Sequence, residues 1–431
     1  MIASARNQAR VSFAQLPHEQ DSESYLREAV VTAVEALGGL HNFVRRGSRV
    51  LLKPNQTLYL PHKTGSTTSP PLIRVLIRLC FEAGAREVWV AEAAGHAQNT
   101  RSVLKKTGMA AAVHDTGAHL IYLDEVAHKI FDFGEDAGPL RWMPAPEVLE
   151  RADVVINVPK AKTHFIDPIS CACKNWVGLI PTSFRLWLQR ERQAYYRGTG
   201  LFLRRFPPTL NIADGAWAGE GQGPGANDPF WWGWIVASVD PVATDVAVCH
   251  FFGLPWEELR MARHAGRLGV GLFDADGVEI VGQNVDQARV NVTPADPSCG
   301  RYPCRVIVGD GPGATLEGTL GHWKTIADGW LKNGVWKILT LRGTPTFMFG
   351  EAEDPDFEIH LKEGPYVVLD DAALDKYKYD KRVTFIPGSP VPQSYMQNEM
   401  VEGLGLGTVY RVGRSVEEMI QQIKGRIQAR A

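Results

Sequence analysis

The stretch N-V-P-K-A-K-T-H, Asn157–His164, decides how we interpret the fold of this chain. The apolar run Ala152–Val158 leads into it, and such a run is typical of a strand buried inside a sheet. Side chains alternate along extended backbone, so Lys160, Lys162 and His164 are predicted to share one face where this strand ends. Groups of like charge repel one another, and a fold that gathers them usually has an anion to place there. The stretch therefore predicts an anion-binding site at a strand end.

Strand and helix patterns alternate on both sides of this stretch. Helices are predicted over Ser24–Leu37, Pro70–Ala83 and Pro241–Phe252, and a proline stands in the first turn of the last two. The β-α-β-α order favours a parallel sheet with helices on both faces. The predicted fold class is α/β, a doubly wound, mostly parallel sheet with a C-terminal α/β subdomain. The strands of the first part are predicted at Arg10–Leu16, Ser48–Lys53, Arg86–Ala91, His119–Leu123, Ala152–Val158, Asn211–Asp214 and Trp234–Ser238.

The 431 residues are enough for two domains, and the pattern changes near Thr293. We predict an α/β domain over residues 1–292 and an α/β subdomain over residues 293–431. Between its strands the first domain has a glycine-rich run, 215–225, which predicts a flexible loop. The segment Ser183–Arg205 interleaves six arginines with aromatic residues, which indicates either a helical excursion that covers the site or a solvated surface helix. Strands of the subdomain are predicted at Arg305–Val308, Trp336–Leu341, Thr346–Phe349, Tyr366–Leu369 and Arg382–Ile386.

The composition excludes several functional classes. Lys and Arg number 46 against 48 Asp and Glu, so no overall basic field points to nucleic acid or to an anionic membrane. No apolar run approaches the roughly 18 to 20 residues that span a bilayer, and the N-terminus lacks an apolar signal core. We therefore expect a cytoplasmic protein with no nucleic-acid or membrane partner. The six cysteines are scattered and do not form a disulfide scaffold, although Cys299 and Cys304 are close enough to pair or to bind a metal.

Polar residues follow the carboxyl ends of several predicted strands, which is where open α/β sheets bind their ligands. Any one of these residues is as easily a cap or a surface charge, but their repetition at successive strand ends favours a shared site. The residues are Lys53 and Asn55 after the second strand, Glu92 and His96 after the third, Lys160, Lys162 and His164 after the fifth, and Asp214 and Glu220 after the next.

Two further segments add to this site. The run T-G-S-T-T-S-P, residues 64–70, leads into a helix, and hydroxyl groups such as that of Thr68 make an anion seat there. N-capping by Ser69 is the simpler explanation of that residue. Lys174 and Asn175 begin a later helix or turn. Because lysines that lie close together lower one another's pKa, one of the lysines is predicted to be a neutral amine that acts as a base or nucleophile.

From these patterns we assign roles to the candidate residues. The predicted catalytic residues are His164, Lys162 and Asp214, and the metal ligands of a divalent ion, if one is bound, are Glu92 and His96. The predicted substrate-binding residues are Lys53, Asn55, Thr68, Lys160, Lys174, Asn175 and Glu220.

Six ordered motifs give this chain a resemblance to a known family. They are K-P-N, the proline-started helix with G-A-R-E-V after it, N-V-P-K-A-K-T-H, K-N-W-V-G-L-I-P, I-A-D-G-A-W-A-G-E-G-Q-G-P and S-V-D-P-V-A-T-D. Over about Ser48–Leu254 the chain resembles the domain of unknown function family 362, DUF362. Many members carry a ferredoxin-like domain with two four-iron clusters, which implies redox chemistry. This chain lacks those cysteines, so no iron-sulfur cluster is expected. The pattern at the strand ends is also faintly similar to nickel-dependent lactate racemases, without a motif match.

Three functions are consistent with these observations. The first is an enzyme that acts on a carboxylated or phosphorylated metabolite, in particular an oxidoreductase that takes electrons from an external redox partner. The second is a metal-assisted lyase, isomerase or hydrolase with Glu92, His164 and Asp214 as ligands. The third is a non-catalytic carrier of an anion or cofactor. An anionic small molecule is the expected partner in each case, while the cofactor, a bound divalent metal and a homodimer stay open.

Overall fold

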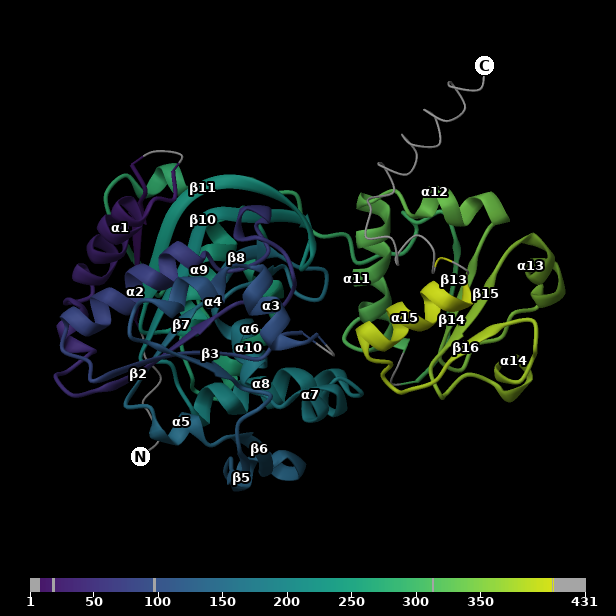
Figure 1. Cartoon of the computed structure of the whole chain (residues 1–431), viewed down its shortest axis with the longest axis horizontal. Coiled ribbons are helices and arrows are strands. Elements are labelled where there is room, and N and C mark those ends of the chain that lie inside the picture. Colours follow the sequence, from purple (N-terminus) through teal and green to yellow (C-terminus); the bar gives the residue numbers. More distant parts are fainter. Residues whose placement is uncertain (1–7, 18–19, 96–97, 312–313, 405, 407–431) are drawn as a thin grey trace, which may run out of the picture. The chain divides into compact units, whose positions relative to one another are not determined.

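The chain forms two compact units, one of residues 1–188 with 193–296 and the other of residues 189–192 with 297–431. The computed structural model describes residues 8–17, 20–95, 98–311, 314–404 and 406 (Figure 1). None of the helices in these ranges has the length and hydropathy to cross a bilayer. The two units are described separately below.

The first unit is built on a ten-stranded sheet with the central order β12-β1-β11-β10-β7-β2-β3-β4. The pairs β10-β7, β7-β2, β2-β3, β3-β4 and β1-β12 are parallel, whereas β11 is antiparallel to both β1 and β10. The sheet is therefore mostly parallel, and the predicted α/β fold class is confirmed. The strands are β1 (Ala9–Gln15), β2 (Arg49–Pro54), β3 (Glu87–Glu92), β4 (His119–Tyr122), β7 (Val154–Val158), β8 (Lys160–Thr163), β9 (Ile169–Ser170), β10 (Leu210–Gln222), β11 (Ala226–Ser238) and β12 (Val278–Val281).

Helices cover both faces of this sheet. On one face, α1 (Glu23–Glu35) and α2 (Pro70–Glu82) share a buried core with alternate strand residues such as Leu52 and Ile156. On the other face, the next residue along β7, Asn157, donates to the carbonyl of Ala172 in the short helix α6. The side chains of β7 thus alternate between an apolar core and a polar layer. The remaining helices and strands are α3 (Thr100–Lys106), α4 (Met109–His114), β5 (His128–Asp132), β6 (Trp142–Pro146), α5 (Val148–Arg151), α6 (Ala172–Asn175), α7 (Thr182–Leu188), α8 (Arg192–Arg205), α9 (Pro241–Phe251) and α10 (Arg260–Arg267).

The predicted flexible loop at 215–225 was wrong. Strand β10 continues to Gln222 and pairs with β11, and Figure 1 shows the two long strands side by side. Glycine serves close packing here, because a Cβ on Gly215 would lie 2.3 Å from the ring of Trp232. A Cβ on Gly219 would lie 2.8 Å from the carbonyl oxygen of Gly65. These glycines therefore let neighbouring chains approach the strand, which is a common reason for glycine inside a strand.

The second unit contains a four-stranded parallel sheet of order β13-β14-β15-β16. The predicted strand Trp336–Leu341 was wrong, because Trp336–Leu339 is the helix α12. Its buried residues, Trp336 and Leu339, are three apart and Lys337 between them is exposed, which is the helical period. The elements are β13 (Arg305–Val308), α11 (Thr319–Lys332), α12, β14 (Thr346–Phe349), α13 (Phe357–Glu363), β15 (Tyr366–Leu369), α14 (Asp375–Lys378), β16 (Thr384–Ile386) and α15 (Gln393–Gly403).

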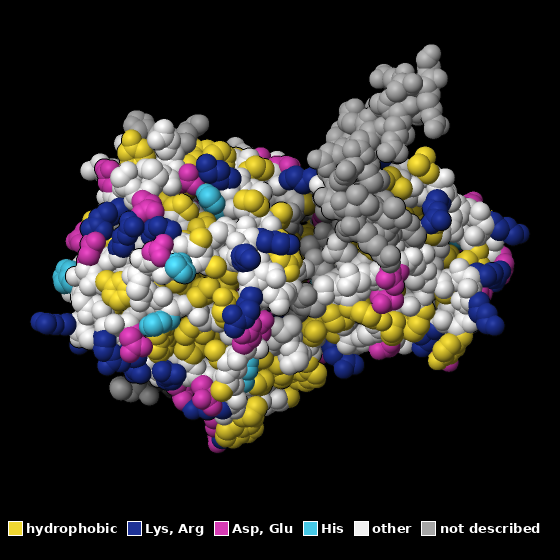
Figure 2. Space-filling view, viewed as in Figure 1, with side chains coloured by type: hydrophobic (Ala, Val, Ile, Leu, Met, Phe, Trp, Pro, Cys, Tyr) yellow, Lys and Arg dark blue, Asp and Glu magenta, His cyan; other side chains and the backbone are white. Residues whose placement is uncertain are grey.

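Charges of both signs alternate on the surface of the first unit. Figure 2 shows basic and acidic side chains intermingled over α1 and α2, where Arg27 pairs with Glu82 and Arg78 pairs with Glu23. Exposed pairs of this kind contribute little to stability. Inside this unit, three buried lysines lie at the carboxyl ends of the parallel strands.

Candidate functional site

Three lysines meet at the carboxyl edge of the first sheet. Lys53 lies near the end of β2, in register with Asn157 on β7. Lys160 and Lys162 lie in β8, which pairs with β10 so that Lys160 is opposite Asp214. All three lysine side chains are at most 1% exposed. Since a buried ammonium group without a counter-charge is unfavourable, the partner of each lysine defines its state.

Lys53 is neutralised by Glu92. Its Nζ lies 2.6 Å from Oε1 of Glu92, which is itself 2% exposed. The same carboxylate accepts hydrogen bonds from the backbone N–H groups of Gln56 and Ala93, at 2.7 and 2.9 Å. Burial lowers the pKa of Lys53, and the charge of Glu92 opposes this shift. Gly178 packs directly on the pair, because a Cβ there would lie 2.8 Å from the Nζ of Lys53.

Lys160 is neutralised by Asp214. Its Nζ lies 3.0 Å from Oδ2 of Asp214, and both side chains are fully buried. The same oxygen accepts from the backbone N–H of Ser69, at 2.7 Å, just before α2 begins. Pro70 and Pro71 have no N–H groups, so few backbone donors remain at this helix start. The anion at the start of α2 is therefore the protein's own carboxylate.

The predicted anion seat contributes a structural link through Thr68. Its hydroxyl accepts from the N–H of Asn55 and donates to the carbonyl of Val158, each at 2.8 Å. Thr68 thus ties the end of β2 to the end of β7.

Lys162 differs from the other two lysines. Its Nζ donates to the carbonyl oxygen of Ser66, to Oδ1 of Asn55 at 3.4 Å and to the carbonyl of Pro224 at 3.5 Å. No carboxylate among the described residues lies within salt-bridge distance of it. Burial, followed by the charges of Lys174 and Lys160, lowers the pKa of Lys162 to about 7. This lysine is therefore close to the point at which it gains or loses a proton at neutral pH.

His164 follows directly after β8, two residues beyond Lys162, and it is buried. Its Nδ1 accepts a hydrogen bond of 3.1 Å from the N–H of Ile166. Burial lowers the pKa of His164 well below 6.5, and the charges of Lys174 and Lys162 lower it further. A neutral imidazole whose Nδ1 accepts has its proton on Nε2, so His164 can donate a hydrogen bond from that atom.

The helical excursion supplies two more groups. Lys174, which is partly exposed, lies 3.4 Å from the hydroxyl of Tyr195 on α8. The guanidinium of Arg185 on α7 is buried and donates to the carbonyls of Ile180 and Ala94. Burial lowers the pKa of Arg185. No role was predicted for Tyr195 or Arg185 from the sequence, although its mixture of arginine and aromatic residues marked Ser183–Arg205 as a segment that could cover the site.

Asparagine amides connect the strand ends to one another. Asn55 donates to Asn175 at 3.3 Å, Asn175 donates to Asn157 at 2.8 Å, and Asn157 donates to Asn211 at 2.9 Å. Asn211 ends the chain by donating to the carbonyl of Ser238 at 3.0 Å. The sequence analysis missed Asn157 and Asn211. Each is a polar residue within an apolar strand sequence. Since buried polar groups need hydrogen-bond partners, this pattern could have indicated that the two side chains contact other polar groups.

The remaining predicted residues lie apart from this cluster or outside the described residues. Glu220 is partly exposed and accepts from the N–H of Thr293 at 2.6 Å. Glu92 is engaged by Lys53, and His96 lies outside the described residues. Within the described ranges no group of three His, Cys, Asp or Glu side chains could hold a metal ion, so the metal assignment stays a prediction. No disulfide bond joins Cys299 to Cys304 in the described part of the chain.

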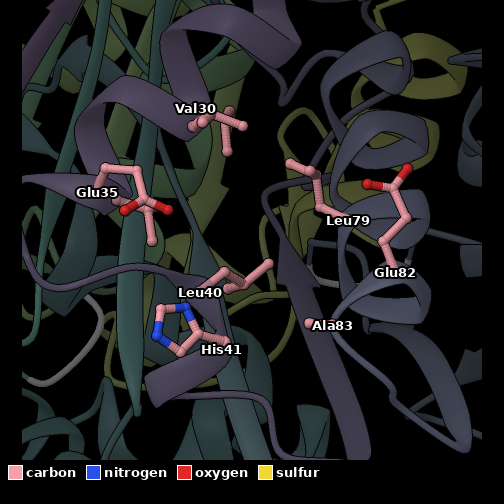
Figure 3. A pocket seen from close by; sticks show the side chains of 9 residues that line it. Val30, Glu35, Leu40, His41, Leu79, Glu82 and Ala83 are labelled. Carbon is pink, nitrogen blue, oxygen red and sulfur yellow. The ribbon is translucent and has the colours of Figure 1, made fainter.

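A small cavity lies between α1, α2 and the 3₁₀ turn Leu40–Asn42 (Figure 3). Its walls are apolar, with Glu35, Glu82 and His41 at the rim. It lies at the C-terminal end of α2, whereas Ser69 and the lysines lie at the other end of this 13-residue helix, about 20 Å away. Two carboxylates at the rim do not favour an anion, and no predicted site residue lines this cavity.

The chain is an α/β protein with buried lysines and asparagines at the carboxyl ends of its parallel strands. Residues 50–250 match the family model "Domain of unknown function (DUF362)", so the chain carries a DUF362 domain, as its motifs predicted. The chain is 29% identical over 264 residues to "Thylakoid-associated protein sll1697" of Synechocystis sp.. That alignment covers 58% of this chain and 78% of the relative.

Two solved structures resemble the whole chain weakly. A crystal structure of a protein from Thermotoga maritima has a TM-score of 0.35 and 11% identity, and covers 86% of this chain and 97% of that protein. The lactate racemase apoprotein of Thermoanaerobacterium thermosaccharolyticum has a TM-score of 0.39 and 10% identity, and covers 92% of each chain.

Proposed function

We propose that the first unit is an enzyme that binds an anionic small molecule, a carboxylate or a phosphate ester, at Lys162. The observation that carries this proposal is the difference between the three buried lysines. Lys53 and Lys160 each contact a carboxylate, whereas the contacts of Lys162 within the described residues are with carbonyl and amide oxygens. A buried charge without a counter-charge costs several kcal/mol, and a bound anion would offset that cost.

Neighbouring groups support an anionic ligand. Lys174 and Arg185 add two cations that have no carboxylate contact in the described part of the chain. Ser69, from the same loop as Ser66, has a buried hydroxyl with no hydrogen-bond partner there. A free hydroxyl donor beside lysines is suited to a carboxylate or phosphate oxygen.

In this proposal Lys162 is the acid–base group: its neutral amine accepts a proton from the substrate, and its ammonium form returns that proton. A group whose pKa is near 7 can accept and return a proton at neutral pH, and its neutral amine can also act as a nucleophile. His164 donates a hydrogen bond to the anion from Nε2. Asp214 holds Lys160 in place rather than acting on the substrate, because its Oδ2 is already engaged by Lys160 and Ser69.

Ligand-induced stabilisation tests the site. The melting temperature is measured with sulfate, phosphate and a panel of mono- and dicarboxylates for the wild type, for Lys162→Met and for Lys129→Met. Lys129 is a matched control because it is an exposed lysine that pairs with Glu150. We expect at least one anion to raise the melting temperature of the wild type and the control saturably. Lys162→Met should bind that anion at least about 10-fold more weakly, since hydrogen bonds to charged groups contribute about 1.5–3 kcal/mol.

Equal affinity in the wild type and Lys162→Met would contradict the proposed site. Turnover of the anions that bind then distinguishes an enzyme from the carrier alternative, and mass spectrometry of the native protein identifies ligands that co-purify. Oxidoreductase chemistry with an external donor stays a prediction, and these anions give the candidate substrates with which to test it.

A further inference from the structure

We propose that Asn55 is the positioning residue of Lys162, and that four buried asparagines hold this lysine through neutral amides so that its counter-ion is the bound anion. The identity of the counter-ion rests on the proposed function. The positioning itself rests on the contacts between Lys162, Asn55, Asn175, Asn157 and Asn211, which share no charged partner along the chain of amides.

The direction of the amide chain fixes the orientation of Asn55. Each amide nitrogen donates to the oxygen of the next asparagine, from Asn55 through Asn175 and Asn157 to Asn211, which donates to a backbone carbonyl. Because Nδ2 of Asn55 is used by Asn175, its Oδ1 faces Lys162. A reversed Asn55 would place its own donor against an ammonium donor. The chain therefore presents an acceptor to Lys162 without presenting a charge.

A carboxylate of the same shape can replace the amide at position 55, with loss of the hydrogen bond that Asn55 donates to Asn175. Asparagine and aspartate are nearly isosteric, and the two other buried lysines of the cluster do contact a carboxylate. Among the side chains that accept from the three buried lysines, Glu92 and Asp214 are carboxylates and Asn55 is neutral. An aspartate there would supply the counter-charge from the protein and would compete with an anionic ligand.

The charged groups around Lys162 also affect its pKa. Lys160 on its own strand and Lys174 on α6 lower its pKa, whereas Glu92 at the end of β3 raises it. His164 faces it but is neutral, because its own pKa lies well below 6.5. An opposite charge within about 4–6 Å shifts a pKa by about 1–3 units, so a carboxylate at position 55 should raise the pKa of Lys162 measurably.

The pH dependence of stability tests this without any ligand. Unfolded Lys162 holds its proton up to about its ordinary pKa of 10.5, whereas folded Lys162 loses it near 7. The unfolded chain therefore binds more protons between these values, and the contribution of Lys162 to stability rises with pH across that window. In Asn55→Asp this rise should begin at least about one pH unit higher than in the wild type. In the Lys162→Met background, Asn55→Asp should produce no such shift.

An unchanged onset in Asn55→Asp, or the same shift with and without Lys162, would overturn the positioning role. Should Asn55→Asp not fold, Asn55→Ala tests the same role, with a shift of the onset pH in the opposite direction. It removes an acceptor of the ammonium group, so the rise should begin at lower pH, and an unchanged onset would again overturn the role.

Sulfate titration separates this inference from the proposed function, because sulfate keeps its charge across the pH range. We expect Asn55→Asp to bind sulfate at least about 10-fold more weakly than the wild type. A pH shift together with undiminished sulfate affinity would refute the claim that the anion is the counter-ion of Lys162. If no anion binds the wild type but the pH shift is present, the proposed function fails while the positioning of Lys162 by Asn55 stands.

Discussion

The two sheets of this protein differ in the charged residues at the carboxyl ends of their strands, because the first has lysines beside carboxylates and the second has carboxylates. In the first unit the edge residues Lys53, Lys160 and Lys162 are buried. In the second unit the residues after the strands include Asp310 and Glu351, which are exposed, and Asp370, which is buried and accepts a hydrogen bond from the hydroxyl of Thr319. A carboxylate in water needs no partner, whereas a buried ammonium does. A polar residue at a strand end thus becomes informative about function when its charge is buried and its counter-charge is missing.

Removing a counter-charge should distinguish the two edges most strongly. Glu92→Gln leaves Lys53 buried without a carboxylate, and we expect it to lower the free energy of unfolding by about 3–5 kcal/mol. The matched substitution Glu351→Gln at the second edge should change it by less than about 0.5 kcal/mol, because that side chain is exposed. Urea unfolding, followed by a signal assigned to each unit, measures both. Similar losses in the two variants would contradict the distinction.

Removing the unpaired charge should have the opposite sign. Lys162→Met replaces a buried cation with an apolar side chain of similar length, and at pH 6–7 we expect it to stabilise the ligand-free protein by about 2 kcal/mol. This advantage should shrink above pH 7 by up to about 1.4 kcal/mol per pH unit, because the wild type gains stability there. Thermal or urea unfolding from pH 6 to pH 10 gives the profile. A loss of stability in Lys162→Met at pH 6 would mean that Lys162 already has a counter-charge.

Packing at the lysine edge can be tested with one methyl group. A Cβ on Gly178 would lie 2.8 Å from the Nζ of Lys53 and 3.0 Å from Oε1 of Glu92. Gly178→Ala should therefore cost about 1–3 kcal/mol, by displacing the buried pair. Gly329→Ala is the control in the second unit, where a Cβ meets nothing within 4 Å and helix α11 should gain about 0.5–1 kcal/mol. Equal stability of Gly178→Ala and the wild type would indicate that the pair adjusts freely.

Much of the fold could be predicted from the sequence because its periodicity is local. The helices at Pro70 and Pro241 begin where the proline signal places them, and β2, β3, β14 and β15 lie where apolar runs end at polar residues. The errors came from contacts that are distant in the sequence. The glycines of β10 looked like a loop because Trp232 and Gly65, which need the space, are not neighbours in the chain.

The site was predictable in its residue types but not in its pairing. Lysines and asparagines at strand ends follow from the apolar runs that precede them. Which lysine contacts a carboxylate depends on Glu92 and Asp214, which are separated from their lysines by 39 and 54 residues. Only the folded chain shows that, of the three buried lysines at this edge, Lys162 has no carboxylate contact among the described residues.

The chain of asparagines has a consequence for folding kinetics. Asn55 and Asn175 are separated by 120 residues, and the amides come from β7, β10, α6 and the segment after β2. Contacts between distant segments carry the loop-closure entropy of the intervening chain, so they form slowly and depend on earlier contacts. We therefore expect these amides to join only after the central strands have found their register. Acquisition of anion affinity during refolding would then report completion of the sheet.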